Sequence, residues 1–259
     1  MVSAELMNQV QKLVVDVAKY AHRDRSLKIE NKGVHDFVTG ADKKISNILS
    51  EELPKLLEGS AVISEEGERR DLSSRYSWVI DPIDGTSNFM YGNPCHAVSV
   101  GLLEGTTSVL GVIYAPMQKE MFYAMKGCGA FCNGEKICVS ADETISHALV
   151  AMETNPYIDR KINRFSKIMG RFFDDCIDIR ILGSAALACS YVADGRCGVF
   201  VAEGVKPWDI AAGDIIIREA GGKLTLWNGE APTFMGNENI IASSGALYDE
   251  ARQRMKDFA

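Results

Sequence analysis

The sequence has no long uninterrupted apolar run, no basic leader and no low-complexity linker. Its apolar stretches fall well short of the roughly 18 residues that a membrane-spanning helix requires. Residues 1–20 alternate polar and apolar positions at helical spacing, whereas a secretory signal peptide joins a basic start to an apolar core. We therefore expect a cytoplasmic protein with no membrane partner.

Positive charge is scarce in this chain. It carries 28 Lys and Arg against 35 Asp and Glu, which gives a formal net charge of -7. Such a balance opposes binding to nucleic acid polymers. A small anion would need a cation, or a focused set of backbone N–H groups, to enter so acidic a protein. We expect a small-molecule ligand and no nucleic acid partner.

Several common site patterns are missing. The 7 Cys are an odd number without a Cys-x-x-Cys pair, in a chain of 259 residues that can bury a core without disulfides. This favours a reducing compartment, with most thiols packed as small buried hydrophobes. The 4 His have no neighbouring Ser or Cys nucleophile motif, and no glycine pattern matches a nucleotide-binding fingerprint.

The order of apolar patterns predicts an α/β (α+β) protein. Two amphipathic helices open the chain, and Pro54 is expected to kink or stop the second near Glu52. Short apolar runs between residues 61 and 124 predict a mixed or antiparallel sheet, with a hairpin over 103–107. From residue 146, strands alternate with helices. We expect an N-terminal α+β lobe, 1–145, packed against a C-terminal α/β lobe, 146–259, with a site between them.

The segment Asp81-Pro-Ile-Asp84-Gly85-Thr86 follows an apolar strand and is the most informative in the chain. Pro restricts the backbone, and Gly85 permits a tight turn into a helix, so the two carboxylates can converge. Two acids in a dehydrated cleft need a shared proton, a basic partner or a bound cation. All-oxygen ligands favour Mg²⁺. The alternative is that Asp81 ends the strand and Asp84 caps the helix, without a metal.

Two further acids lie where they could join this pair. Glu65 follows the apolar run 61–64, at a strand end that can share a sheet edge with Asp81. Asp209 lies in the first turn of a predicted helix, where it is also a favourable residue for the helix dipole. Small residues at 211–213 indicate that this helix packs closely, which would hold Asp209 rigidly.

Taken together, these segments resemble the inositol monophosphatase family of Mg²⁺-dependent, lithium-sensitive phosphatases. The order and separation of the matching blocks cover nearly the whole chain. The blocks are Asp36–Asp42, Ser64–Gly67, Asp81–Asn88, Trp208–Gly213 and Glu219–Gly222. The resemblance implies a layered αβαβα sugar-phosphatase fold and a homodimer.

The resemblance also implies a division of roles within the site. Two or three Mg²⁺ ions would be held by Glu65, Asp81, Asp84, Asp209 and the main-chain carbonyl of Ile83. Catalytic roles would fall to Glu65, Thr86 and Asp42, which place or help deprotonate the attacking water. The phosphate would be bound by the amides of Gly85 and Thr86 and by Lys32. The substrate would contact Asp84, Gly183, Ser184, Ala185, Glu203 and Asp209.

The substrate is less narrowly predicted than the reaction. The resemblance implies hydrolysis of a small phosphorylated metabolite, by default myo-inositol 1-phosphate, through direct attack of metal-activated water. Relatives act on fructose 1,6-bisphosphate, histidinol phosphate, adenosine 3',5'-bisphosphate or NADP. The acid that relatives use for sugar hydroxyls aligns with Ala202, and the adjacent Glu203 faces the opposite side of a strand. A catalytically silent phosphate-binding or metal-binding regulator is the non-enzymatic alternative.

Overall fold

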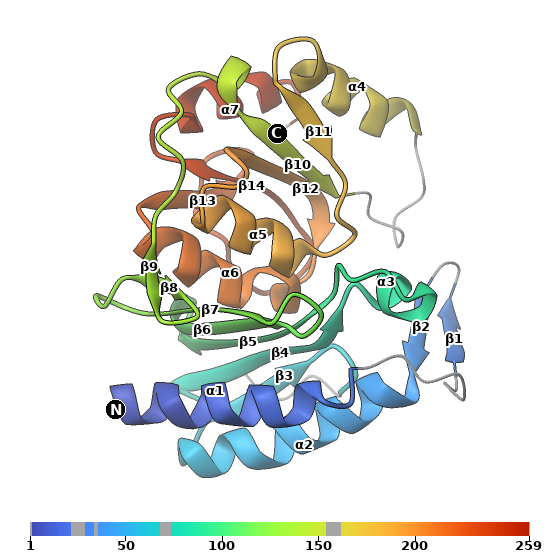
Figure 1. Cartoon of the computed structure of the whole chain (residues 1–259), viewed down its shortest axis with the longest axis vertical. Coiled ribbons are helices and arrows are strands. Elements are labelled where there is room, and N and C mark those ends of the chain that lie inside the picture. The colour runs from blue at the N-terminus through green and yellow to red at the C-terminus, as the bar shows by residue number, and fades with distance from the viewer. Residues whose placement is uncertain (1, 22–28, 34–35, 68–73, 154–161, 259) are drawn as a thin grey trace.

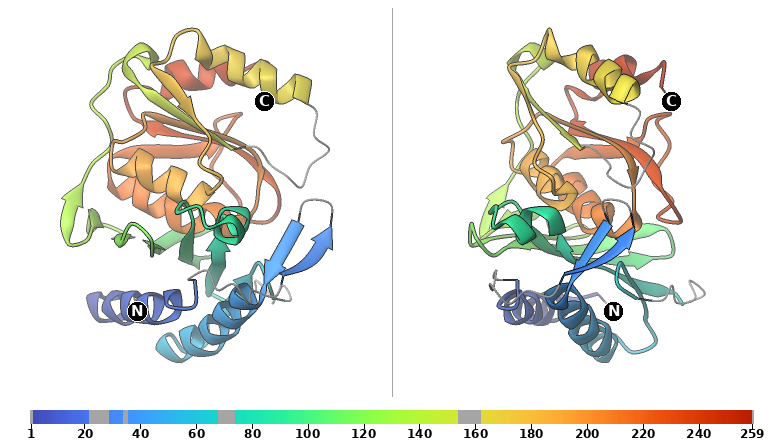
Figure 2. Two further views of the ribbon diagram at one scale, coloured as in Figure 1. Left: turned by 45° about the vertical axis from the view of Figure 1, so that its right-hand side comes forward. Right: turned by 90° about the vertical axis from the view of Figure 1, so that its right-hand side faces the viewer.

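Helix pairs and sheets alternate in layers along the molecule (Figure 1). A computed structural model describes residues 2–21, 29–33, 36–67, 74–153 and 162–258. The helix pairs are α1 (Ala4–Ala18) with α2 (Gly40–Leu56), α5 (Ala185–Ala193) with α6 (Pro207–Glu219), and α4 (Ile162–Phe173) with α7 (Tyr248–Met255). One sheet lies between the first two pairs and a second sheet between the last two, in every view (Figure 2). The predicted αβαβα layering is confirmed.

The first sheet has seven strands in the order β3-β4-β5-β6-β7-β8-β9. They are β3 (Ala61–Ser64), β4 (Tyr76–Asp84), β5 (Ala97–Glu104), β6 (Thr107–Ala115), β7 (Glu120–Met125), β8 (Ala130–Cys132) and β9 (Glu135–Ile137). Only β3 and β4 pair in parallel, so the sheet is mixed, as predicted. The β5–β6 hairpin confirms the turn predicted over 103–107.

The second sheet has five strands in the order β11-β10-β12-β14-β13. They are β10 (Leu149–Glu153), β11 (Asp178–Arg180), β12 (Val199–Val205), β13 (Gly222–Leu226) and β14 (Glu238–Ser244). β10 pairs in parallel with β11 and β12, whereas β14 is antiparallel to both of its neighbours. The carboxyl ends of β10 and β12 therefore meet at one edge, next to the start of α6.

Close packing holds the middle helix pair against the first sheet. A Cβ built at Gly111 in β6 would lie 2.5 Å from the carbonyl oxygen of Ala212, so a larger residue would push α6 off the sheet. Gly101 in β5 approaches Ala211 in the same way, with 2.9 Å to its backbone. This contact fixes the helix that carries Asp209.

Of the two outcomes predicted for Pro54, the stop near Glu52 did not occur, and the prediction of mostly buried thiols was wrong. α2 runs through Pro54 to Leu56. Leu49 and Leu53 stay fully buried, and this packing offsets the backbone donor that the proline ring removes. Most thiols are not buried: all seven Cys are free, and only Cys189 and Cys197 are buried. No helix in the described ranges is long and apolar enough to cross a bilayer.

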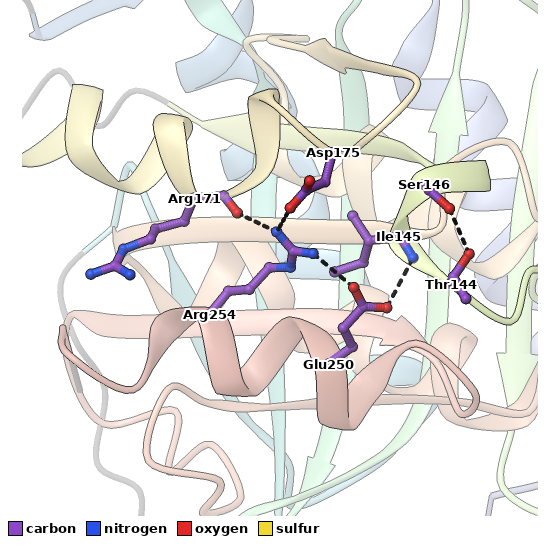
Figure 3. Close-up of polar contacts among 7 residues, drawn as sticks. All are labelled: Thr144, Ile145, Ser146, Arg171, Asp175, Glu250 and Arg254. Carbon is purple, nitrogen blue, oxygen red and sulfur yellow. Dashed lines mark hydrogen bonds and ion pairs between the residues drawn. The ribbon is translucent and has the colours of Figure 1, made fainter.

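A partly buried arginine links the two outer helices (Figure 3). Arg254 of α7 donates to Asp175 and to the carbonyl of Arg171 at 2.6 Å each, and to Glu250 at 2.7 Å. Glu250 also accepts from the amide of Ile145, in the segment that joins the two sheets. We call Arg171, Asp175, Glu250 and Arg254 the Arg254 cluster.

Candidate active site

A β-bulge in β4 brings Asp81 and Asp84 to the same side of the first sheet. Along β5, Asp81 pairs with Ser99 and Asp84 with Ala97, so β4 contains one residue more than its partner over this stretch. Without that extra residue, side chains three positions apart would point to opposite faces. Pro82, which has no N–H for the ladder, lies inside the bulge. Both carboxylates are buried.

Asp209 reaches the same point from the start of α6. Its Oδ2 accepts a 2.7 Å hydrogen bond from the amide of Lys206, so it does cap the helix. One oxygen each of Asp81, Asp84 and Asp209 can be chosen so that all lie within 4.8 Å of one another. We call these three residues the acidic cluster. It draws on β4 of the first sheet and on α6 of the middle layer.

The electrostatics of the acidic cluster call for a cation. Burial, together with neighbouring carboxylates, raises the pKa of Asp81 well above its ordinary value. Burial likewise raises the pKa of Asp84 to about 6 and that of Asp209 to about 7. Among the described residues, no Lys or Arg side chain makes an ion pair with the cluster.

Asp81 supplies the test of whether a metal fits. Its Oδ1 is buried and has no hydrogen-bond partner among the described residues. Leaving a charged oxygen buried without a partner costs about 3 kcal/mol. A hard divalent cation surrounded by carboxylate oxygens would remove that cost, and oxygen ligands are those that Mg²⁺ prefers. The residues present therefore fit a magnesium ion.

Glu65 and Ile83 are neighbours of the acidic cluster but are not among the three residues that compose it. Glu65 follows β3, its amide donates to the carbonyl of Ile80 at 3.1 Å, and its charge raises the pKa of Asp81. The parallel pairing of β3 and β4 thus places both acids at one edge. The side chain of Ile83 is fully buried, and its carbonyl accepts a 3.0 Å hydrogen bond from the hydroxyl of Thr86.

The hydroxyl of Thr86 lies between the Ile83 carbonyl and Asp42, a buried acid outside the acidic cluster. It lies 3.4 Å from Oδ1 of Asp42, while Oδ2 of Asp42 accepts a 2.9 Å hydrogen bond from the amide of Thr39. The hydroxyl of Thr39 also donates to that oxygen. Asp42 is therefore held from one side by the cap of α2 and faces Thr86 with its other oxygen. Sequence analysis did not single out Thr39, although its place before a helix is the usual signal of a cap.

Gly85 makes the turn from β4 into α3 (Thr86–Tyr91). Its φ is +86°, and an added Cβ would lie 2.8 Å from the carbonyl oxygen of Cys95 and 2.9 Å from that of Gly183. Only glycine fits both the conformation and the space. The amides of Gly85 and Thr86 precede the first complete turn of α3, where backbone N–H groups have no helical acceptor.

Ser184 and its neighbours hold Asp84 from the second half of the chain. The Ser184 hydroxyl donates to Oδ2 of Asp84, and the amide of Ala186 donates to the same oxygen at 2.9 Å. Ser184 also caps α5. The side-chain amide of Asn88 donates to the carbonyls of Leu182 at 2.8 Å and Gly183 at 3.2 Å, so the predicted Gly183–Ala185 stretch lies beside α3.

Glu203 does not join the acidic cluster. Its Oε1 is 2.6 Å from Nε of Arg164 in α4. In β12, Val201 packs with the outer helices α4 and α7, whereas Ala202 packs with α5 and α6. Glu203, one position beyond Ala202, lies on the outer face, so the predicted contact of Glu203 with substrate is corrected. Lys32 lies in β1 (Ile29–Gly33), which pairs with β2 (Asp36–Thr39), but its side chain is outside the described part.

Glu153 is an acid at the site that sequence analysis missed. It ends β10, and its Oε1 accepts a 3.2 Å hydrogen bond from the amide of Ser184. Burial, with the charges of Asp84 and Asp209, raises its pKa to about 8. The available signal was its place directly after an apolar strand, the same signal that identified Glu65.

The fold and the site together define a layered α/β protein with a cluster of carboxylates suited to a cation. A sequence model of the inositol monophosphatase family matches residues 2–257. The chain therefore belongs to the inositol monophosphatase family.

Individual proteins show the same likeness. A Thermotoga maritima protein named fructose-1,6-bisphosphatase/inositol-1-monophosphatase is 40% identical over 236 residues, covering 88% of this chain and 86% of its own. The Escherichia coli protein named Nus factor SuhB is 34% identical over 243 residues, covering 93% and 90%. The solved structure of the Bartonella henselae extragenic suppressor protein suhB superposes with a TM-score of 0.91 at 32% identity, covering 99% and 100%.

Proposed function

We propose that the protein is a Mg²⁺-dependent phosphomonoesterase that hydrolyses a small phosphorylated polyol. The observation that carries this proposal is the acidic cluster, with carboxylate oxygens within 4.8 Å and a buried, partnerless oxygen on Asp81. A cation bound in this position would also offset the repulsion between a phosphate and a chain of net charge -7. Membership of the family supports the same reaction class.

In this proposal Glu65, Asp81, Asp84, Asp209 and the Ile83 carbonyl hold two or three ions. Bound Mg²⁺ would lower the pKa of a coordinated water and neutralise charge on the phosphate. The amides of Gly85 and Thr86 would donate to the phosphate oxygens, because no helical carbonyl occupies them.

Thr86 and Asp42 would handle the proton of the attacking water. Thr86 has one hydroxyl proton and two acceptors within reach, Asp42 Oδ1 at 3.4 Å and the Ile83 carbonyl at 3.0 Å. When Thr86 donates to Asp42, its lone pairs remain free to accept from a water. Glu65, at the end of β3, would help to place that water for direct attack, so the reaction needs no covalent phosphoenzyme.

The proposed default substrate is myo-inositol 1-phosphate. The name of the 40% identical relative from Thermotoga maritima favours fructose 1,6-bisphosphate as the second candidate for the same chemistry. Histidinol phosphate, adenosine 3',5'-bisphosphate and NADP complete the panel. Lobes at 1–145 and 146–259, a homodimer and a cytoplasmic location belong to the same proposal.

A non-enzymatic role is the competing proposal, favoured by the relatives that carry the name Nus factor SuhB. A binding protein would need the acidic cluster for affinity but would not need the arrangement of Thr86 and Asp42. The presence of both in hydrogen-bond geometry supports catalysis.

Phosphate release from the substrate panel tests the proposal. With millimolar Mg²⁺ we expect multiple turnovers on at least one sugar or inositol phosphate, and none after chelation with EDTA. We also expect millimolar Li⁺ to inhibit the reaction. A protein that binds Mg²⁺ but releases no phosphate from any member of the panel would favour the binding role instead.

A further inference from the structure

Glu153 lies on the face of the second sheet that looks toward the acidic cluster. In the parallel pairing of β10 with β12, Glu153 is the register partner of Ala202. Register partners in neighbouring strands project to the same face. Ala202 packs among residues of α5 and α6, and so does Ala151, two positions before Glu153. The carboxylate therefore leaves the sheet on the inner side, at the edge where α6 begins.

One hydrogen bond orients the Glu153 carboxylate and leaves further acceptor sites on its oxygens. Oε1 accepts from the amide of Ser184 at 3.2 Å, and the hydroxyl of Ser184 donates to Asp84. Above its pKa of about 8, the ionised carboxylate offers about four lone-pair sites on two oxygens. Glu153 is partly exposed, and the charges of Asp84 and Asp209 contribute to its raised pKa. It stands beside the cluster but outside the three residues that compose it.

Two other acids, Asp42 and Glu203, interact with other partners. Asp42 is held by Thr39 and faces Thr86. Glu203 pairs with Arg164 on the outer face. The methyl group of Ala202, next to Glu153, offers no polar atom to a ligand. Within the described ranges, Glu153 is thus an acid on the inner face that is neither part of the acidic cluster nor paired with a basic side chain.

We propose that Glu153 is a specificity-determining residue that accepts a hydrogen bond from a substrate hydroxyl. The inference rests on the proposed function: a phosphate at the acidic cluster would place the rest of the molecule next to the end of β10. A carboxylate there recognises a ligand with vicinal hydroxyl groups, which is a polyol phosphate. It offers nothing to an aromatic or alkyl phosphate ester, which lacks a donor.

The test compares two substrates in the Glu153→Gln variant. At pH 9, above the Glu153 pKa of about 8, we expect kcat/KM for inositol 1-phosphate to fall about tenfold or more relative to kcat/KM for phenyl phosphate, because a hydrogen bond to a charged group is lost. The change should lie mainly in KM. Glu203→Gln is the matched control: the same residue type on the adjacent strand, facing outward, where the substrate ratio should stay within about twofold.

Each outcome decides the proposal. An equal loss on both substrates would show that Glu153 only supports the Ser184 turn, and would overturn the inference. An unchanged ratio would overturn it as well. If wild-type protein hydrolyses neither substrate, the proposed phosphatase fails and this inference fails with it, a result distinct from a failure confined to the variant. Glu153→Asp, which keeps the charge but shortens the reach, should also lower the ratio if Gln misfolds.

Discussion

Two regions of this molecule bring several charged groups together, one partly exposed and one buried, and they differ in how the charges are balanced. In the Arg254 cluster, one guanidinium supplies donors to Asp175 and Glu250 and to a carbonyl (Figure 3). In the acidic cluster, three carboxylates crowd together, and no described basic side chain pairs with them. The first region is complete as it folds. The second has no such counter-charge among the described residues, which is why we propose a cation there.

The difference teaches how to separate a structural charge cluster from a functional one. Paired charges hold elements together, here α4, α7 and the segment around Ile145. Clustered charges of one sign oppose folding, so such clusters are typical of sites that bind a ligand of opposite charge. Raised pKa values for Asp81, Asp84 and Asp209 express that opposition.

The largest expected effect is on turnover. Asp84→Asn removes a charged oxygen ligand but keeps the shape of the side chain, so kcat/KM should fall by about a thousandfold or more. The far-UV circular dichroism spectrum should not change. Asp178→Asn, at an exposed acid paired with Arg180, is the control and should retain activity. Near wild-type activity in Asp84→Asn would refute our metal assignment.

Breaking the Arg254 cluster should affect stability but not chemistry. Arg254→Met leaves Glu250 without its partner and should lower the free energy of unfolding by about 2 kcal/mol, discounted because Asp175 is exposed. Urea denaturation measures this change. Arg75→Met, at an exposed pair with Glu104, should leave the free energy of unfolding nearly unchanged, because solvent screens that pair. Equal losses in both variants would remove the distinction between these pairs.

Neutralising an acid should change the free energy of unfolding in opposite directions at an unpaired acid and at an acid paired with an arginine. Without metal at pH 8, Asp81→Asn should raise the free energy of unfolding by about 1 kcal/mol, because it removes an unpaired buried charge. Asp214→Asn should lower it by about 1 kcal/mol, because this buried acid pairs with Arg218 at 2.8 Å. Denaturation with EDTA present checks both variants, and a loss of stability in Asp81→Asn would contradict our account of the acidic cluster.

The smallest effect is the pH dependence of the metal-free protein. The pKa values of Asp84 and Asp209, about 6 and about 7, lie above the unfolded value near 3.8. The folded state therefore binds more protons, so stability from these groups is full below about pH 4 and is lost as pH rises through 6 and 7. The gain in Tm with Mg²⁺ should grow from near zero at pH 5 to about 3 °C at pH 8.

The control for this titration is choline chloride at matched ionic strength, which screens charge without binding carboxylates. It should raise Tm less than Mg²⁺ does at pH 8. A Mg²⁺ effect that is the same at pH 5 and pH 8 would show that the ion does not bind at groups titrating in this range.

Much of the fold could be predicted from local pattern. The helices, the 103–107 hairpin and the change to alternating strands and helices near residue 146 all follow from apolar periodicity. The short strands β8 and β9, of three residues each, have too few positions to show alternation. The stop considered at Pro54 did not occur, because helix continuation there depends on the burial of Leu49 and Leu53, and burial is a tertiary property.

The candidate site divides along the same line. Asp81, Asp84 and Thr86 were predictable because they lie within six residues of one another around a glycine turn. Glu203 was predicted as a substrate contact and Glu153 was not considered. Their roles depend on which face of the second sheet each side chain takes, and on which strand pairs with which.

The sequence alone determined that this chain carries short-range acid motifs, at strand ends and a helix start, in the order shared by one family. Only the tertiary structure decided which of those acids meet. The bulge at Pro82 turned Asp81 and Asp84 to one side, and α6 packed against glycines of the first sheet to bring in Asp209. The physical reason is that side-chain direction and distance over many residues depend on register and packing, which are set by partners remote in the chain.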